Sequence, residues 1–143
     1  TLKGTPSNEY FVNAGIIADF IEIIDLENMS SKLIYGPTQD FPEFKISYSV
    51  GYQMADFGRN STNRYMDVYP GSSSFYVLFN GKTYKQLSDP DNLNRIFEFD
   101  YDGNILNQYQ LDYPVYGIAV DEEARAIYGV TVDREPNLVR FDY

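Results

Sequence analysis

The apolar residues of this 143-residue chain recur mostly at every second position, in short runs separated by turn-forming residues. This alternation is typical of β-strands with one buried face, and no segment shows a sustained helical period of 3.6 residues. Residues 19–33 could suggest a helix, but Ile21 to Leu26 is rich in β-branched residues and Glu27 to Ser31 in turn formers. We therefore predict strand, turn and strand there, and an all-β fold.

One strand pattern occurs three times along the chain and predicts a structural repeat. Its copies are residues 21–26, 96–101 and 138–143. We expect the aspartates of this pattern to be equivalent on the third strand of successive units, and the apolar residues before them to be buried between units. These pairs are Ile24 and Asp25, Phe99 and Asp100, and Phe141 and Asp142. A second correspondence aligns residues 66–78 with residues 118–130 without gaps, with a hairpin turn in both copies.

The repeats predict antiparallel four-stranded meanders, in which each strand pairs with the next along the chain. The middle unit is complete, the first shows no convincing first strand, and the last has no fourth. The predicted strands are 10–16, 21–26 and 32–35, then 65–69, 75–80, 95–101 and 105–111, then 116–120, 126–132 and 138–143. The predicted organisation is a blade at 8–36, an insertion at 37–63, a complete blade at 64–111 and a last blade at 112–143.

Four-stranded units of this length are typical of β-propeller blades, and closed propellers use about four to eight of them. Ten strands correspond to about three blades, so the chain is interpreted as half of a ring. Unpaired edges at residues 10–16 and 138–143 then favour edge-mediated association between copies.

The order of four motifs resembles the C-terminal half of bacterial TolB-like six-bladed propeller proteins over about residues 8–143. The motifs are residues 63–69, 75–83, 96–104 and 118–122. The resemblance implies a six-bladed ring without an assigned activity, and a protein that is exported to the periplasm or cell envelope. The insertion at 37–63 and the absence of a leader sequence depart from that pattern.

Composition excludes several kinds of function. The 21 acidic residues exceed the 11 basic ones, giving a net charge of −10, which argues against nucleic acid and anionic membranes as partners. No apolar run is long enough for membrane insertion. Because the chain has no His and no Cys, it has no imidazole or thiolate metal site and no Ser-His-Asp triad. We predict no cofactor.

Several acidic segments could carry chemistry, but each also has a plain structural interpretation. Residues 100–104 resemble a Ca²⁺ loop, yet Gly103 is misplaced for an EF-hand and the segment reads better as a hairpin turn. Residues 88–92 read as an acidic solvated loop. Paired carboxylates could hydrolyse glycosides, and the loop candidates are Asp40, Glu43, Asp89, Asp91, Asp133 and Glu135. Tyrosines could stack on a sugar or a peptide, although at alternating strand positions they more often pack between blades. Those considered are Tyr48, Tyr52, Tyr65, Tyr113 and Tyr116.

In a four-stranded meander, the loops between the second and third strands and those between units emerge on the same side. Both unusual insertions, 37–63 and 82–94, therefore belong to one elaborated face together with 133–137. We predict a binding site there, with candidate residues Tyr84, Lys85, Asp89, Asp91, Arg95, Asp133 and Arg134. The favoured function is non-enzymatic binding or scaffolding of a protein or glycan. The alternative is a carboxylate- or Ca²⁺-dependent hydrolase whose site is shared with absent blades.

Overall fold

The computed structural model describes residues 1–36, 38–39, 41–86, 92–131 and 137–143. These residues form β-strands and one short 3-10 helix, η1 (Tyr84–Gln86), with no α-helix among them, so the all-β prediction is confirmed. The strands are β1 (Leu2–Gly4), β2 (Tyr10–Ala14), β3 (Phe20–Asp25), β4 (Ser30–Tyr35), β5 (Phe44–Ser49), β6 (Tyr52–Phe57), β7 (Tyr65–Pro70), β8 (Ser74–Phe79), β9 (Arg95–Asp100), β10 (Ile105–Gln110), β11 (Ile118–Asp121), β12 (Ala126–Thr131) and β13 (Asn137–Asp142).

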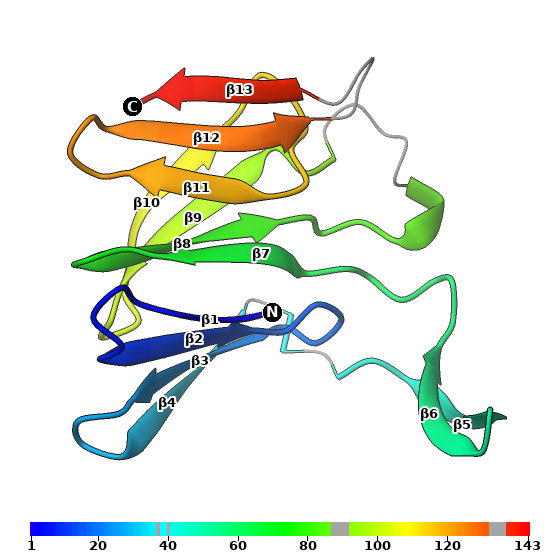
Figure 1. The fold of residues 1–143 in the computed structure, drawn as a ribbon. Helices are drawn as coiled ribbons and strands as arrows, with labels where there is room; N and C mark the ends of the chain where they lie inside the picture. The colour runs from blue at the N-terminus through cyan, green and yellow to red at the C-terminus, as the bar shows by residue number, and fades with distance from the viewer. Residues whose placement is uncertain (37, 40, 87–91, 132–136) are drawn as a thin grey trace.

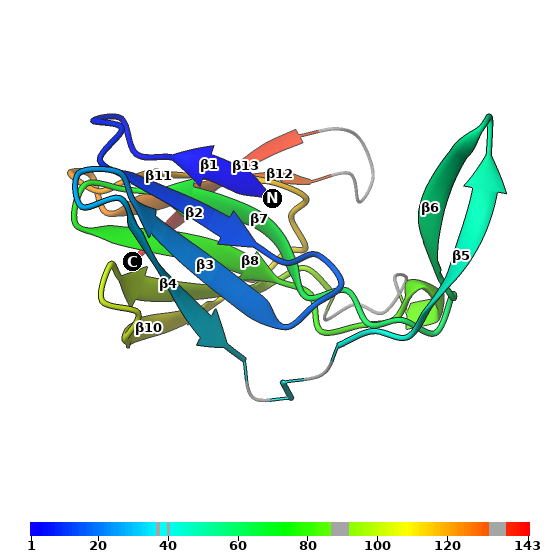
Figure 2. The ribbon, with the colours of Figure 1, turned by 90° about the horizontal axis from the view of Figure 1, so that it is seen from below.

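Three sheets form the body of the molecule, and each is an antiparallel meander (Figure 1). The first has the order β1-β2-β3-β4, the second β7-β8-β9-β10 and the third β11-β12-β13. They are stacked face to face, as propeller blades are. A fourth, two-stranded sheet of β5 and β6 stands apart from this stack (Figure 2).

The first strands of the three sheets lie next to one another, β1 beside β7 and β7 beside β11. Asp67 on β7 joins all three. Its Oδ1 lies 2.7 Å from the Lys3 ammonium on β1, and its Oδ2 accepts a 2.9 Å hydrogen bond from the Ile118 N–H on β11. One half-buried carboxylate thereby fixes the relative position of successive sheets.

Two apolar layers hold the stack together, one between each pair of neighbouring sheets. Because strand side chains alternate between faces, the middle sheet contributes Phe75, Val77 and Phe99 to one layer and Tyr76, Leu78 and Ile96 to the other. Aromatic pairs fill both layers, including Phe75 stacked on Phe99 with centroids 5.3 Å apart. Burial of these faces from both sides explains the nearly continuous apolar run of β8.

The threefold repeat is confirmed in register. Asp25, Asp100 and Asp142 each end the third strand of their sheet and pair with the start of the second strand, at Tyr10, Ser74 and Ala126.

The expected burial before these aspartates is only partly correct, because Phe99 is buried whereas Ile24 and Phe141 are half-buried. Ile24 faces away from the second sheet, and no further sheet covers it among the described residues. Phe141 lies at the rim of its layer.

The first sheet contains a strand that the sequence did not predict. Leu2–Gly4 forms β1 and pairs with β2 through residues such as Lys3 and Val12. The expected edge at residues 10–16 is therefore wrong, because β2 lies between β1 and β3. The edge at β13 is present as predicted, and association through it stays a prediction.

Candidate functional site

The 37–63 insertion contains a β-hairpin that projects from the body, which we call the arm (β5 and β6, residues 44–57). Its strands pair from Phe44 and Phe57 at the base to Ser49 and Tyr52 near the tip. The two-residue turn Val50-Gly51 has positive φ at both positions, 52° and 84°. This is the conformation of the tight turns whose twist suits antiparallel strands.

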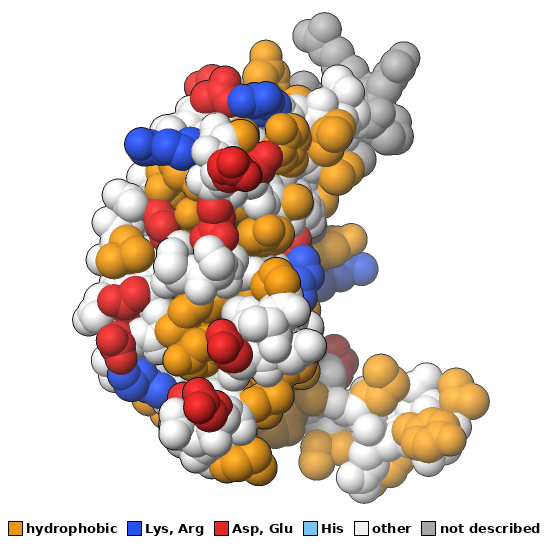
Figure 3. All heavy atoms as spheres, turned by 60° about the vertical axis from the view of Figure 1, so that its left-hand side comes forward, with side chains coloured by type: hydrophobic (Ala, Val, Ile, Leu, Met, Phe, Trp, Pro, Cys, Tyr) orange, Lys and Arg blue, Asp and Glu red, His pale blue; other side chains and the backbone are white. Residues whose placement is uncertain are grey.

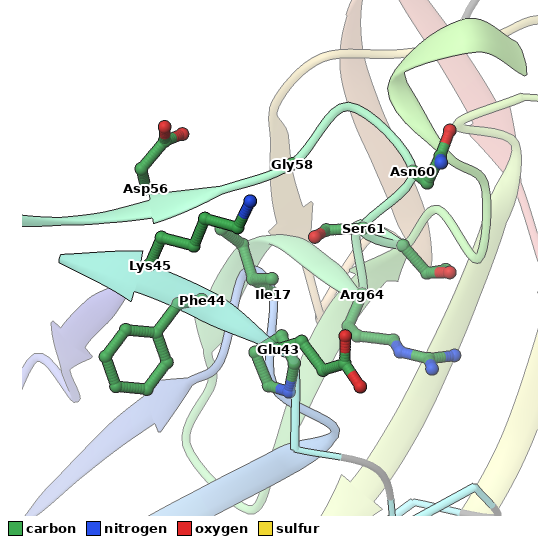
Figure 4. A pocket seen from close by; sticks show the side chains of 11 residues that line it. Ile17, Glu43, Phe44, Lys45, Asp56, Gly58, Asn60, Ser61 and Arg64 are labelled. Atoms are coloured by element: carbon green, nitrogen blue, oxygen red, sulfur yellow. The ribbon is translucent and has the colours of Figure 1, made fainter. Parts of the chain in front are cut away.

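The two faces of the arm differ in chemistry. Directly paired residues share a face, so one face carries Phe44 with Phe57, Ile46 with Ala55, and Tyr48 with Gln53. We call this set the apolar face. The opposite face carries Lys45 with Asp56, Ser47 with Met54, and Ser49 with Tyr52. Figure 4 shows the Phe44 ring pointing away from Ser61 and Arg64 on the body side.

Asp19, a buried carboxylate at the end of the first sheet's β2–β3 turn, anchors the base of the arm. It accepts hydrogen bonds from the N–H and hydroxyl of Thr38, before the arm, and from the Tyr65 hydroxyl, after it. Burial alone would raise the pKa of Asp19, but these hydrogen bonds and the nearby Arg64 charge outweigh it and hold the pKa below its usual value. The arm is therefore tied to the body on both sides of the insertion.

A cleft of about 800 Å³ lies between the arm and the body (Figure 4). The arm contributes Phe44, Lys45 and Asp56. Its lining combines two cations, two anions, three small polar side chains and a few apolar groups. The complete lining is Ile17, Pro42, Glu43, Phe44, Lys45, Asp56, Gly58, Asn60, Ser61, Thr62 and Arg64.

The second insertion adjoins the end of the first. Thr62 forms an isolated antiparallel bridge with Thr83, and the Asn63 N–H donates to the Lys82 carbonyl at 2.8 Å. Helix η1 therefore lies on the same side of the sheets as the arm (Figure 1). The described parts of the two insertions share one face, as predicted, while residues 133–136 lie outside the described residues.

The structure describes three of the seven candidate site residues predicted from sequence. Tyr84 and Lys85 are exposed on η1, and the Arg95 guanidinium lies 5.5 Å from the centroid of the Phe79 ring. None of these three lines the cleft. The other candidates, Asp89, Asp91, Asp133 and Arg134, lie outside the described residues, as do Asp40 and Glu135 of the carboxylate set.

Sequence reasoning missed most of the cleft. Glu43 was considered, as a loop carboxylate, but Lys45, Asp56 and Arg64 were not. The signal for the arm was present, because residues 44–48 alternate apolar and polar ahead of a Val-Gly turn. Among the five tyrosines considered for sugar stacking, Tyr65 is buried in the core, and Tyr48 and Tyr52 lie on opposite faces of the arm.

The second buried carboxylate, Glu98, belongs to the apolar layer between the second and third sheets. It accepts hydrogen bonds from the hydroxyls of Ser74, Tyr76 and Tyr109 and from the Asn107 amide, at 2.7–3.1 Å. Burial would raise its pKa, yet these four donors hold the pKa below its usual value. Glu98 and Asp19 are thus stabilised as anions, which suits structural acceptors rather than general acids.

The Asp100–Asn104 segment is a hairpin turn, as its plain interpretation predicted. The Asn104 N–H and side-chain amide both donate to the Asp100 carboxylate, at 2.8 and 2.9 Å. Gly103 has φ of 87°, which only glycine adopts without strain. In the described residues no group of three or more acidic side chains is arranged to hold a metal ion.

Comparison with known proteins supports the blade interpretation. A family model described as TolB-like 6-blade propeller-like matches residues 2–123, which include the first two sheets of the body, the arm and β11, the first strand of the third sheet. No curated protein matches the chain. Among the described residues, no helix has the length and apolar character needed to cross a membrane.

Proposed function

Because the chain belongs to the TolB-like six-bladed propeller family, we propose that it is a non-enzymatic binding or scaffold propeller of the cell envelope. Its partner, a protein or a glycan, binds in the cleft between the arm and the body. The observation that carries this proposal is the cleft itself, a hollow of about 800 Å³ beside an anchored hairpin on the elaborated face of the sheets.

The lining of the cleft supports a polar partner of extended shape. Lys45 and Arg64 supply cationic donors, Glu43 and Asp56 supply acceptors, and Ser61 and Thr62 supply hydroxyls. Ile17 and Pro42 add apolar surface against which a sugar ring or an apolar side chain can pack. A lining with both charges favours a partner that carries donors and acceptors over one of a single charge.

Filling the cleft tests the proposal. Ser61→Trp places a large ring in the cleft, whereas Ser73→Trp places the same ring in the exposed β7–β8 turn on the other side of the sheets. The immobilised chain and both variants are incubated with solubilised cell-envelope proteins and, separately, with cell-wall glycan fragments. We expect at least about tenfold weaker retention by Ser61→Trp alone, since disrupting the centre of a contact site costs about 2 kcal/mol or more and about 1.4 kcal/mol already corresponds to tenfold. Equal retention by both variants would refute the proposed site.

A further inference from the structure

The outer half of the arm is uncharged and unusually apolar at its surface. Residues 46–55 contain no Asp, Glu, Lys or Arg. On the apolar face, Phe44, Ile46 and Tyr48 are 58%, 62% and 74% exposed. Figure 3 shows hydrophobic side chains gathered on the lobe that projects from the body. Contiguous apolar surface of this kind on a projecting element marks a contact site.

The tip of the arm is both strained and apolar. Val50 has φ of 52° and is 92% exposed. A β-branched residue at positive φ is an outlier, because its side chain crowds the backbone there. Asn would suit this turn position better. Val50 therefore serves neither the turn nor the core, and its apolar side chain is available for an intermolecular contact.

The charge of the chain indicates which partner the arm suits. Each copy carries a net charge of −10, so two copies repel one another across most of their surfaces. The outer arm is neutral, so two copies can approach through their arms with the least repulsion. The apolar face is also self-complementary, because apolar residues lie at both of its ends and in its middle. Tyr48 lies towards the tip, and the Phe44–Phe57 pair lies at the base.

We propose that the arms of two copies pack face to face about a two-fold axis, forming a two-layer contact of four strands. In an isologous contact the tip of each arm lies against the base of the other. Tyr48 and Val50 of one copy then meet Phe44 and Phe57 of the second, and Ile46 lies near the axis. This inference goes beyond the proposed function, because partner binding in the cleft does not require a second copy.

The contact area sets the strength of this pairing. Each large side chain of the apolar face exposes on the order of 100 Å², so two arms bury on the order of 800 Å² in total. Stable interfaces bury about 1,200–2,000 Å². The dimer is therefore weak and reversible, and it forms at high protein concentration. Salt strengthens it by screening repulsion between the acidic bodies.

Sedimentation equilibrium of the 143-residue chain, across the micromolar range and at low and high salt, tests the proposal. The informative pair is Tyr48→Ser and Tyr52→Ser, because the two tyrosines are 74% and 75% exposed but lie on opposite faces of the arm. We expect Tyr48→Ser to weaken dimerisation at least about fivefold and Tyr52→Ser to leave it within about twofold.

A second variant separates loss of contact from loss of the hairpin. Val50→Asn suits the turn better and keeps the arm folded, yet it removes an apolar contact, so we expect weaker dimerisation despite a more stable arm. A chain that stays monomeric at all concentrations would overturn the proposal. So would a dimer that Tyr48→Ser and Tyr52→Ser weaken equally, or one that none of these variants weakens, since that pairing would use another surface.

Discussion

At the residue scale, the Glu98 carboxylate is tightly constrained, because it receives four hydrogen bonds from neutral donors on β8 and β10, the two strands that flank its own. The Tyr76 hydroxyl also lies 3.1 Å from the Tyr143 hydroxyl, so the network extends to the end of β13. Four donors directed at one buried group suit an anion, and they explain why a charge is retained between apolar layers.

Replacing Glu98 with Gln tests this network. The amide offers one acceptor oxygen in place of two and brings N–H groups towards the Asn107 amide or the Tyr109 hydroxyl. We expect the free energy of unfolding at pH 7 to fall by about 1–3 kcal/mol. Because the folded-state pKa of Glu98 is lowered, the stability it contributes is present above the unfolded pKa and is lost as pH falls through the folded value.

The difference in stability between the chain and Glu98→Gln should therefore shrink as pH falls below the ordinary glutamate pKa of 4.5. Urea denaturation at pH 7 and at successively lower pH measures it. Glu123→Gln, at an exposed turn position, serves as the control and should change stability little at any pH. A difference that grows on acidification would contradict the assignment of Glu98 as a stabilised anion.

At the element scale, all strands of the three body sheets except β1 could be predicted from the sequence, because each of them has a local signature. Alternation and the repeated Asp-terminated pattern located third strands such as β9, and turn chemistry placed the β9–β10 hairpin. Strand β1 escaped because Leu2–Gly4 is too short to show alternation, and its place depends on pairing with β2 and on the Lys3–Asp67 ion pair.

The candidate site was less predictable than the strands, for a physical reason. The cleft joins Ile17 with residues of the insertion and with Arg64, and no local pattern states how the arm lies against the body. That placement depends on Asp19 reaching Thr38 and Tyr65, which are far apart in the sequence. The direction of the strands in each meander therefore predicted the side of the sheets on which the two insertions lie, but not which residues meet there.

The Val50-Gly51 turn gives a prediction about the arm as an element. Val50→Asn should relieve on the order of 1 kcal/mol of backbone strain, because Asn tolerates positive φ. Hydrogen exchange of the arm amides measures local opening, and we expect protection to increase about fivefold, since that free energy corresponds to such a factor. Val50→Ala is the matched control, because it removes the branched side chain without favouring positive φ. Equal protection in both variants would show that strain at this turn does not limit arm stability.

At the scale of the whole molecule, a residue's contribution depends on where its sheet lies in the stack rather than on its local sequence. Ile21, Ile96 and Leu138 are equivalent in the repeat and project towards the C-terminal side of the stack. Ile21 and Ile96 each meet the following sheet and are buried, whereas Leu138 is 65% exposed because no described sheet packs on the outer face of the third.

This difference predicts unequal effects of equivalent substitutions. Ile96→Ala removes a side chain with no exposed surface and leaves a cavity in a packed layer, so we expect it to destabilise the fold by about 2–5 kcal/mol. Leu138→Ala removes a mostly solvated side chain and should change stability by less than about 0.5 kcal/mol. Urea denaturation monitored by tyrosine fluorescence, at a protein concentration too low for association, gives both values. If Leu138→Ala were as damaging as Ile96→Ala, the outer face of the third sheet would have to be covered in solution. The face that carries Leu138, which is 65% exposed in this structure, would then be an internal layer. The stack of three sheets would in that case not be the folding unit.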